Sequence, residues 1–206
     1  MSKLVEAVGA AHSQLIFGRR VRALVDGIDA LLPPEVASLA DVGCGDGSIG
    51  TAIVARRPGL QYRGFDVMAR PNGRVPVEVF DGLSLPLADR SVDAVMFVDV
   101  LHHASDPAAL LAEARRVART CVIVKDHLAD RPGAELVLSA MDWVGNRPHG
   151  VTMTWDYWSS SQWAAAWKAA GLRPVRSERR LGLYAPPLRP LFERGLHHLT
   201  LLGPAE

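Results

Sequence analysis

Cysteine is scarce in this chain, which holds two among 206 residues. Cys44 lies in a glycine-rich stretch, and Cys121 lies in an apolar run that predicts a buried strand. Two cysteines so placed make neither a disulfide framework nor a metal-ligand set, so we expect both to be reduced thiols of the core. Nothing near Cys44 in the sequence marks a base, which argues against a reactive thiol there.

An excess of charge of one sign is also missing, because 23 lysines and arginines face 22 aspartates and glutamates. A net charge of +1 supplies no broad basic field for a phosphate backbone, which argues against nucleic acid as the main partner.

The first residues lack the uninterrupted apolar stretch of a signal peptide, and no charge-free segment reaches membrane-spanning length. These absences predict a cytoplasmic protein without an integral membrane segment.

The length and the hydrophobic content of 49% suit a single domain over residues 1–206 with a sizeable core. Apolar stripes at helical spacing predict two N-terminal helices within residues 1–34, the second ended by Pro33 and Pro34. Residues 126–172 change to a pattern of helices and a polar, aromatic loop. We expect this segment to form a cap on the substrate side of the domain.

Strand-like apolar runs alternate with helical or turn segments along the first two thirds of the chain. They lie at 37–42, 61–66, 76–80, 93–98 and 119–124, and this alternation predicts a parallel sheet. Asp106 and Pro107 predict the cap and first turn of the helix before the fifth run. Residues 173–179 and 196–202 are predicted to be final antiparallel strands of the same sheet.

A glycine turn after the first strand carries the strongest functional signal. Asp41, Gly43, Gly45 and Gly47 form the pattern D-x-G-x-G-x-G. Alternate glycines let the backbone turn sharply and approach a ligand, and the following helix points its free N–H groups into the same crevice. Asp66 ends the next strand, where doubly wound folds place the acid that accepts ribose hydroxyls. Together these features predict a site for a nucleotide-like cofactor.

The glycine turn resembles motif I of class I S-adenosylmethionine (SAM)-dependent methyltransferases, and Ser48 stands where a dinucleotide fingerprint has its last glycine. Further blocks resemble the ubiquinone-biosynthesis-like (methyltransferase type 11) branch, namely Phe80-Asp81-Gly82, Leu85-Pro86-Leu87 and residues 91–103. The resemblance covers residues 37 to 125. It implies an α/β fold, a Rossmann-like doubly wound seven-stranded sheet with an antiparallel last strand and helices on both faces. It also implies SAM as cofactor, and an Asn-Pro-Pro-Tyr-like block for base methylation is lacking.

The same resemblance implies roles for residues at the ends of successive strands. Asp66 would accept the ribose hydroxyls, and Val67 and Met68 would pack on adenine. Asp81 and the Gly82 backbone would meet the adenine amino edge. The full set of expected cofactor contacts is Arg19, Asp41, Gly43, Cys44, Gly45, Gly47, Asp66, Val67, Met68, Asp81, Gly82 and Val98.

Two kinds of charged residue are expected at the methionine end of the cofactor. Asp41 would orient the methionine ammonium or the glycine turn itself. Arg19 or its neighbour Arg20 would bind the carboxylate through a bidentate pair, at the N-terminus of the second helix. A pair of solvated arginines explains the same two residues equally well.

Histidines follow the fourth and fifth predicted strands, at the carboxyl edge where open α/β sheets bind ligands. A neutral imidazole suits proton transfer near pH 7. His102 is assigned to packing or to a cofactor contact, because histidines at its position occur across the resembled branch without acting as bases. We therefore expect His127, oriented by Asp126, to be the catalytic base, with His103 as the second choice.

All five tryptophans fall after the fifth predicted strand. Trp163 and Trp167 are four residues apart on one helix and indicate buried packing. Trp143 and the segment 155–158 are candidates to line an apolar pocket for the methyl acceptor. The polar groups expected to orient the acceptor in that pocket are Asp142, Asn146 and His149.

These observations predict a SAM-dependent methyltransferase for a small or medium, partly apolar metabolite, with transfer to oxygen because histidine bases are present. Nitrogen and carbon acceptors stay open, as does a non-catalytic SAM-binding partner or regulator. The downstream blocks argue against an NAD-dependent oxidoreductase. No metal is expected, because Asp99, Asp126 and Asn146 do not match the ligand spacing of catechol-type enzymes. The apolar residues of 196–202 are compatible with a homodimer interface, although a last sheet strand is the simpler explanation for them.

Overall fold

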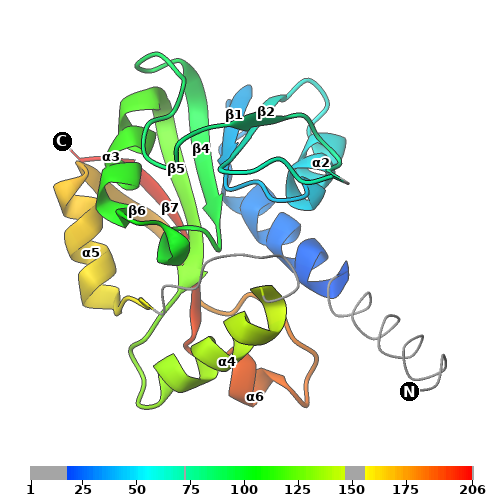
Figure 1. Cartoon of the computed structure of the whole chain (residues 1–206), viewed down its shortest axis with the longest axis vertical. Coiled ribbons are helices and arrows are strands. Elements are labelled where there is room, and N and C mark those ends of the chain that lie inside the picture. The colour runs from blue at the N-terminus through cyan, green and yellow to red at the C-terminus, as the bar shows by residue number, and fades with distance from the viewer. Residues whose placement is uncertain (1–17, 72, 147–155, 206) are drawn as a thin grey trace.

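One mixed sheet organises the chain in the computed structural model, which describes residues 18–71, 73–146 and 156–205. Its strand order is β3-β2-β1-β4-β5-β7-β6 (Figure 1). Only β7 opposes the others, since it is antiparallel to both β5 and β6. The predicted fold class is therefore confirmed. The strands are β1 (Ser38–Val42), β2 (Gln61–Asp66), β3 (Val77–Val79), β4 (Val92–Val98), β5 (Ala118–His127), β6 (Leu172–Glu178) and β7 (His197–Pro204).

Helices connect these strands, and side-chain caps mark the starts of α3 and α5. Asp106 caps α3 by accepting the N–H of Ala109 at 2.9 Å, and Ser159 and Gln162 form a capping box on α5. A helix over residues 18–31 precedes the sheet. The other helical elements are α2 (Ser48–Arg56), the short 3₁₀ helix η1 (Leu101–His103), α3 (Pro107–Val117), α4 (Ala134–Asn146), α5 (Ser160–Ala169) and α6 (Arg189–Phe192).

The two faces of the sheet carry separate apolar cores. The helix 18–31 and α2 cover one face, where Ile28 and Ile53 pack in the cluster that holds Met96 of β4. On the other face α3 and α5 supply side chains that include Trp163 and Trp167. The predicted packing role of these two tryptophans is confirmed. In the described part of the chain no helix is long and apolar enough to cross a membrane.

Strand β5 is longer than the sequence predicts, and this places two candidate site residues. It extends to His127, three positions past the expected end at residue 124, and it pairs there with His197 of β7. Asp126 and His127 therefore lie inside the sheet and are buried. Beyond this end of the sheet lie α4 and α6, which contact each other (Figure 1).

Candidate cofactor and acceptor site

The glycine turn between β1 and α2 has the backbone geometry that a close ligand approach requires. Gly43 has a φ of +75° and packs so tightly that an added Cβ would lie 2.3 Å from Cγ2 of Val100. Gly45 has a φ of +59°, and an added Cβ would meet nothing within 4 Å. Because Gly45 lines a cavity, any side chain at this position would project into the space of a ligand.

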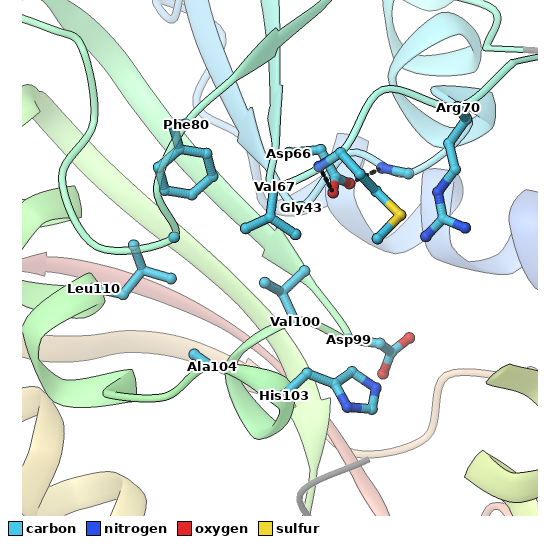
Figure 2. Close-up of a pocket in the computed structure, with 13 residues that line it drawn as sticks. Gly43, Asp66, Val67, Arg70, Phe80, Asp99, Val100, His103, Ala104 and Leu110 are labelled. Atoms are coloured by element: carbon cyan, nitrogen blue, oxygen red, sulfur yellow. Dashed lines mark hydrogen bonds between the residues drawn. The ribbon is translucent and has the colours of Figure 1, made fainter. Parts of the chain in front are cut away.

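A cavity of about 310 Å³ lies at the carboxyl ends of β1, β2 and β4, the edge where such sheets bind ligands. Figure 2 shows Asp66 on one side of Val100, with His103 and Asp99 on the other. The lining residues are Gly43, Gly45, Asp66, Val67, Met68, Arg70, Phe80, Gly82, Asp99, Val100, His103, Ala104 and Leu110.

Asp66 lies at the end of β2 and places its carboxylate in the cavity wall. Its Oδ2 accepts the N–H of Gly45 at 2.9 Å, and its Oδ1 accepts the N–H of Met68 at 3.2 Å (Figure 2). The carboxylate is thus fixed by two backbone donors, both on cavity-lining residues. It faces the cavity as a ready acceptor for hydroxyl groups.

The residues present fit an adenosyl cofactor. Glycines without side chains open the backbone on one wall, and Asp66 offers a carboxylate for a ribose diol. Val67 and Phe80 add apolar surface for a flat ring, and Val67 is 56% exposed. A binding surface for adenine therefore exists beside the acid that would hold the ribose.

Asp66→Ala is expected to weaken SAM binding by about 10- to 150-fold, because a hydrogen bond to a charged group contributes about 1.5 to 3 kcal/mol. Isothermal titration calorimetry measures the affinity, and circular dichroism verifies the fold. Asp81→Ala is the matched control, since this acid also follows a strand but lies outside the cavity lining. Equal losses in both variants would contradict the assignment.

Asp41 lies beneath the glycine turn rather than in the cavity. Tyr62 donates its hydroxyl to Oδ2 of Asp41 at 2.7 Å. Burial raises the pKa of Asp41 to about 7, and the hydrogen bond from Tyr62 offsets only part of this shift. The expected role in the glycine turn agrees with this position, whereas contact with the cofactor ammonium is a proposal.

A carboxyl group whose pKa is higher folded than unfolded destabilises the protein as pH rises between the two values. For Asp41 that window runs from about 4, the unfolded value, to about 7. Asp41→Asn removes this group and keeps an acceptor for Tyr62. As pH rises from 4 to 8, the unfolding free energy of the variant should therefore increase relative to that of wild type by on the order of 4 kcal/mol. Urea unfolding at several pH values measures the difference, and a difference that stays constant with pH would contradict the prediction.

The structure places Arg19 outside the cofactor cavity. Its Nε donates to the carbonyl oxygen of Gly182 at 3.2 Å. Successive residues of a helix point about 100° apart, so Arg20 takes the other direction. Arg20 forms an ion pair with Asp99, which lines the cavity. The helix phase therefore brings Arg20, not Arg19, to the site.

Four other expected cofactor contacts lie outside the cavity lining. Asp81 accepts the backbone N–H groups of the two following turn residues, 83 and 84, at 2.8 and 2.7 Å. Cys44 lies against Gly64, and burial raises the pKa of its thiol to about 12. Val98 packs on the core beneath the helix 18–31, and Gly47 forms the N-cap of α2. Each has a structural reason for its place, so none of the four supports the predicted cofactor contact.

Asp99 sits between two cations at the end of β4. It pairs with Arg20 and with Lys125, whose side chain is fully buried. Burial alone would raise the pKa of Asp99, but the charges of Lys125 and Arg20 hold it well below the usual range. The residue adopts a left-handed φ of +56°, which turns the chain into η1. A permanently ionised carboxylate therefore stands at the cavity wall.

The two candidate histidines differ in their position relative to the cavity. His103 lines the cavity, whereas His127 is 4% exposed and lies outside the lining. His127 is still part of β5, and its Nδ1 lies 3.1 Å from Nδ1 of His197. Burial lowers the pKa of His127, and burial with the neighbouring charge of His102 lowers that of His103 to about 4. The ring of His127 is packed in the interior, so this geometry favours His103 over His127 as the group that faces a ligand in the cavity.

Asp126 orients His102 and not the ring of His127. Its Oδ1 lies 2.6 Å from Nδ1 of His102. Burial alone would lower the pKa of His102, but the charge and hydrogen bond of Asp126 outweigh it and raise the pKa to about 10. On the other side of the ring, Nε2 lies 3.4 Å from Oδ2 of Asp142, which accepts the hydroxyl of Tyr157 at 2.5 Å. His102 thus bridges two buried carboxylates.

The predicted acceptor pocket is only partly described. Trp143 is 49% exposed on α4, and Trp158 packs edge-on against Trp163. The expected residues Trp155 and His149 lie outside the described residues, as does the side chain of Asn146. Asp142 is the one expected polar group that the described residues place beside the histidines.

Sequence reasoning missed cavity residues whose role depends on the turn after β4. Asp99 and Val100 follow the strand directly, so their position at the carboxyl edge was a usable signal. Ala104 and Leu110 enter the lining only because η1 folds back toward the glycine turn. No local sequence pattern predicts that η1 folds back in this way.

Comparison with known proteins gives one family and one curated relative. A family model described as a methyltransferase domain matches residues 16–177. The chain is 37% identical over 127 residues to an uncharacterized 37.1 kDa protein in transposon TN4556 of Streptomyces fradiae. That match covers 56% of this chain and 33% of the other protein. The chain thus spans about a third of the length of the curated relative it matches.

Solved structures with the same fold include two from microbial sources. One is the complex between the Haloferax volcanii Trm112 methyltransferase activator and the putative methyltransferase, with a TM-score of 0.62, 18% identity, and coverage of 100% of this chain and 99% of that one. The other is geranyl diphosphate C-methyltransferase from Streptomyces coelicolor, with a TM-score of 0.67, 16% identity, and coverage of 89% and 77%. At these identities the likeness shows the fold.

Proposed function

Since this chain belongs to the methyltransferase domain family and uses SAM, we propose a function for it within that family. We propose that it methylates an oxygen atom of a small or medium, partly apolar metabolite. The observation that carries the proposal is the position of His103 in the cavity wall, across Val100 from Asp66 (Figure 2). A hydroxyl acceptor must lose its proton as it gains the methyl group, whereas a neutral amine can attack first. Imidazole is the side chain most often placed for such a proton transfer.

The cofactor half of the proposed site follows from the cavity lining. Asp66 accepts the ribose hydroxyls, the backbone at Gly43 and Gly45 lies along the methionine moiety, and Val67 and Met68 cover the adenine. When bound, SAM supplies a methyl group on a positively charged sulfur. The carboxylate of Asp99 lies in the same wall, paired with Arg20 and Lys125.

The acceptor half centres on His103. The acceptor hydroxyl lies against this side chain and releases its proton toward it, while an oxygen lone pair forms the new bond to the methyl carbon. The carbon–sulfur bond breaks, and its electron pair stays with sulfur. Holding the oxygen in line with that bond supplies most of the acceleration.

The proposed acceptor-side cap of the single domain lies within residues 126–172. In this range α4 places Asp142 beside His102 at 3.4 Å, whereas α5 packs with α3 on one face of the sheet. The hydroxyl of Tyr157, which precedes α5, donates a hydrogen bond to Asp142. This placement supports an acceptor that enters between the cap and the end of β4. The two free thiols, Cys44 and Cys121, agree with the proposed cytoplasmic location.

Methyl-labelled SAM and a panel of acceptors test the proposal. The panel matches phenols and other hydroxyl compounds with amines and activated ring carbons of the same size. The expected products are methyl ethers or esters, with one S-adenosylhomocysteine released for each transfer. Transfer to amines or carbon with none to oxygen would overturn the assignment to O-methylation.

A further inference from the structure

We propose that His102, His103 and Asp142 form a site for one divalent transition-metal ion of the zinc type, at the His103 wall of the cavity. One ligand atom from each of the three residues lies within 4.8 Å of the others. Two of these residues belong to η1 after β4, and the third comes from α4. The set forms only when α4 folds over the end of the sheet, so sequence spacing does not display it.

His102 is held in the orientation that a metal ligand needs. Its Nδ1 lies 2.6 Å from Oδ1 of Asp126, and both side chains are buried. A carboxylate accepts hydrogen bonds and donates none when ionised, so Nδ1 carries the proton. The other ring nitrogen, Nε2, is thereby directed toward Asp142. A carboxylate behind a ligating histidine is the usual outer partner of protein metal sites.

The distance between His102 and Asp142 leaves room for one ion held by both side chains. Nε2 of His102 and Oδ2 of Asp142 are 3.4 Å apart. Hydrogen bonds between nitrogen and oxygen span about 2.7 to 3.2 Å. Two ligands held tetrahedrally at about 2.0 to 2.1 Å from one zinc ion are separated by about 3.3 Å. The observed gap matches two ligands of one ion.

Asp142 is also held by an outer partner. The hydroxyl of Tyr157 donates to Oδ2 of Asp142 at 2.5 Å. Nε2 of His127 lies 3.6 Å from Oδ1 of the same carboxylate. Asp142 is therefore fixed between three aromatic side chains, and it cannot turn away from His102 without losing the Tyr157 bond.

The chemistry of the set selects the kind of ion. Two imidazoles and one carboxylate favour Zn²⁺ and related transition ions, whereas Mg²⁺ and Ca²⁺ prefer several oxygen ligands. Three protein ligands are the number found in catalytic zinc sites, which leave one position open. Since His103 lines the cavity, that position faces the acceptor space. With the ion bound, His103 is a ligand and has no lone pair left for the proton of the acceptor, so the ion would take over the activation of the acceptor oxygen. That role rests on the proposed function, but binding of the ion does not.

The alternative to a metal ion is a proton on Nε2 of His102. A doubly protonated His102 would bridge Asp126 and Asp142 without any metal. To separate the two, the purified protein is stripped with a chelator, dialysed, and supplied with Zn²⁺, Co²⁺ or Mg²⁺. We expect one tightly held Zn²⁺ or Co²⁺ per chain by elemental analysis, with a Co²⁺ absorption band in the visible region. Saturating Zn²⁺ should raise the unfolding temperature by about 5 to 10 °C, and Mg²⁺ should do neither.

Variants locate the site independently of methyl transfer. His103→Ala and Asp142→Asn should each weaken Zn²⁺ binding by about 100-fold or more in a chelator competition, while circular dichroism shows the fold retained. His198→Asn is the control, because this buried histidine contacts Thr200 on β7 and lies outside the set. Folded wild-type protein that retains no Zn²⁺, or ligand variants that bind it as wild type does, would overturn the proposal. Tight Zn²⁺ binding in an enzyme that methylates only nitrogen would uphold this site and overturn O-methylation.

Discussion

Gly45→Val is expected to abolish measurable SAM binding, with a loss of at least about 100-fold in affinity, while the fold survives. An added Cβ at Gly45 meets no atom within 4 Å, so the substitution causes no clash inside the protein. The branched side chain instead fills the cavity wall through which the backbone approaches the ligand. The left-handed φ of +59° adds strain of about 1 to 2 kcal/mol to the folded state.

A second glycine separates that strain from the loss of the site. Gly171 has a φ of +69°, also has open space where a Cβ would lie, and follows α5 away from the cavity. Gly171→Val should therefore lose a similar amount of stability and bind SAM normally. Calorimetric titration and thermal unfolding of both variants test the comparison. Retained SAM binding in Gly45→Val would contradict the placement of the cofactor along the glycine turn.

Several residues that line the cavity could be predicted from the sequence because their positions are determined locally. Asp66 and Val67 follow the end of one strand, and Gly43 and Gly45 occupy the turn after another. Strand ends of a parallel sheet meet at one edge, so residues that follow them come together without knowledge of the loops. The apolar runs and the caps at Asp106 and Ser159 determine the elements in the same local way.

The expected and observed positions differ where one residue of offset or one distant contact decides the outcome. Arg19 and Arg20 differ by one step of a helix, and only Arg20 reaches Asp99. His127 was expected in a loop, but the pairing with His197 extends β5 and buries it. Neither the phase of a helix relative to the cavity nor the length of strand pairing follows from a hydrophobic pattern alone.

The partners of the buried charged residues could not be predicted from the sequence either. Asp99 follows β4, and Lys125 and Asp126 lie on β5. Their partners lie elsewhere: Arg20 on the helix 18–31 pairs with Asp99, and His102 of η1 bridges Asp126 to Asp142 of α4. Burying one such carboxylate would be costly, so each requires a cation or a hydrogen-bond donor supplied by tertiary packing. A sequence can mark the charged residues as candidates, but it does not pair them.

His103→Ala is expected to reduce turnover by about 100- to 10,000-fold, the range for removal of a group that transfers a proton, while SAM affinity changes little. The reason is its place in the cavity wall, on the side of Val100 away from Asp66 (Figure 2). His127→Ala should affect turnover less, because its ring lies in the interior against His197. It should instead lower the unfolding temperature, since it leaves a cavity and removes the partner of His197.

Single-turnover methyl transfer at saturating SAM and acceptor compares the two variants without interference from product release. Thermal unfolding and calorimetric SAM titration accompany each measurement, so a misfolded variant is recognised before its rate is interpreted. A His103→Ala enzyme that runs at wild-type speed would remove His103 from the mechanism. A larger loss in a folded His127→Ala variant would return the proton transfer to the end of β5, where the acceptor would then have to approach from beneath α4 rather than through the cavity beside Val100.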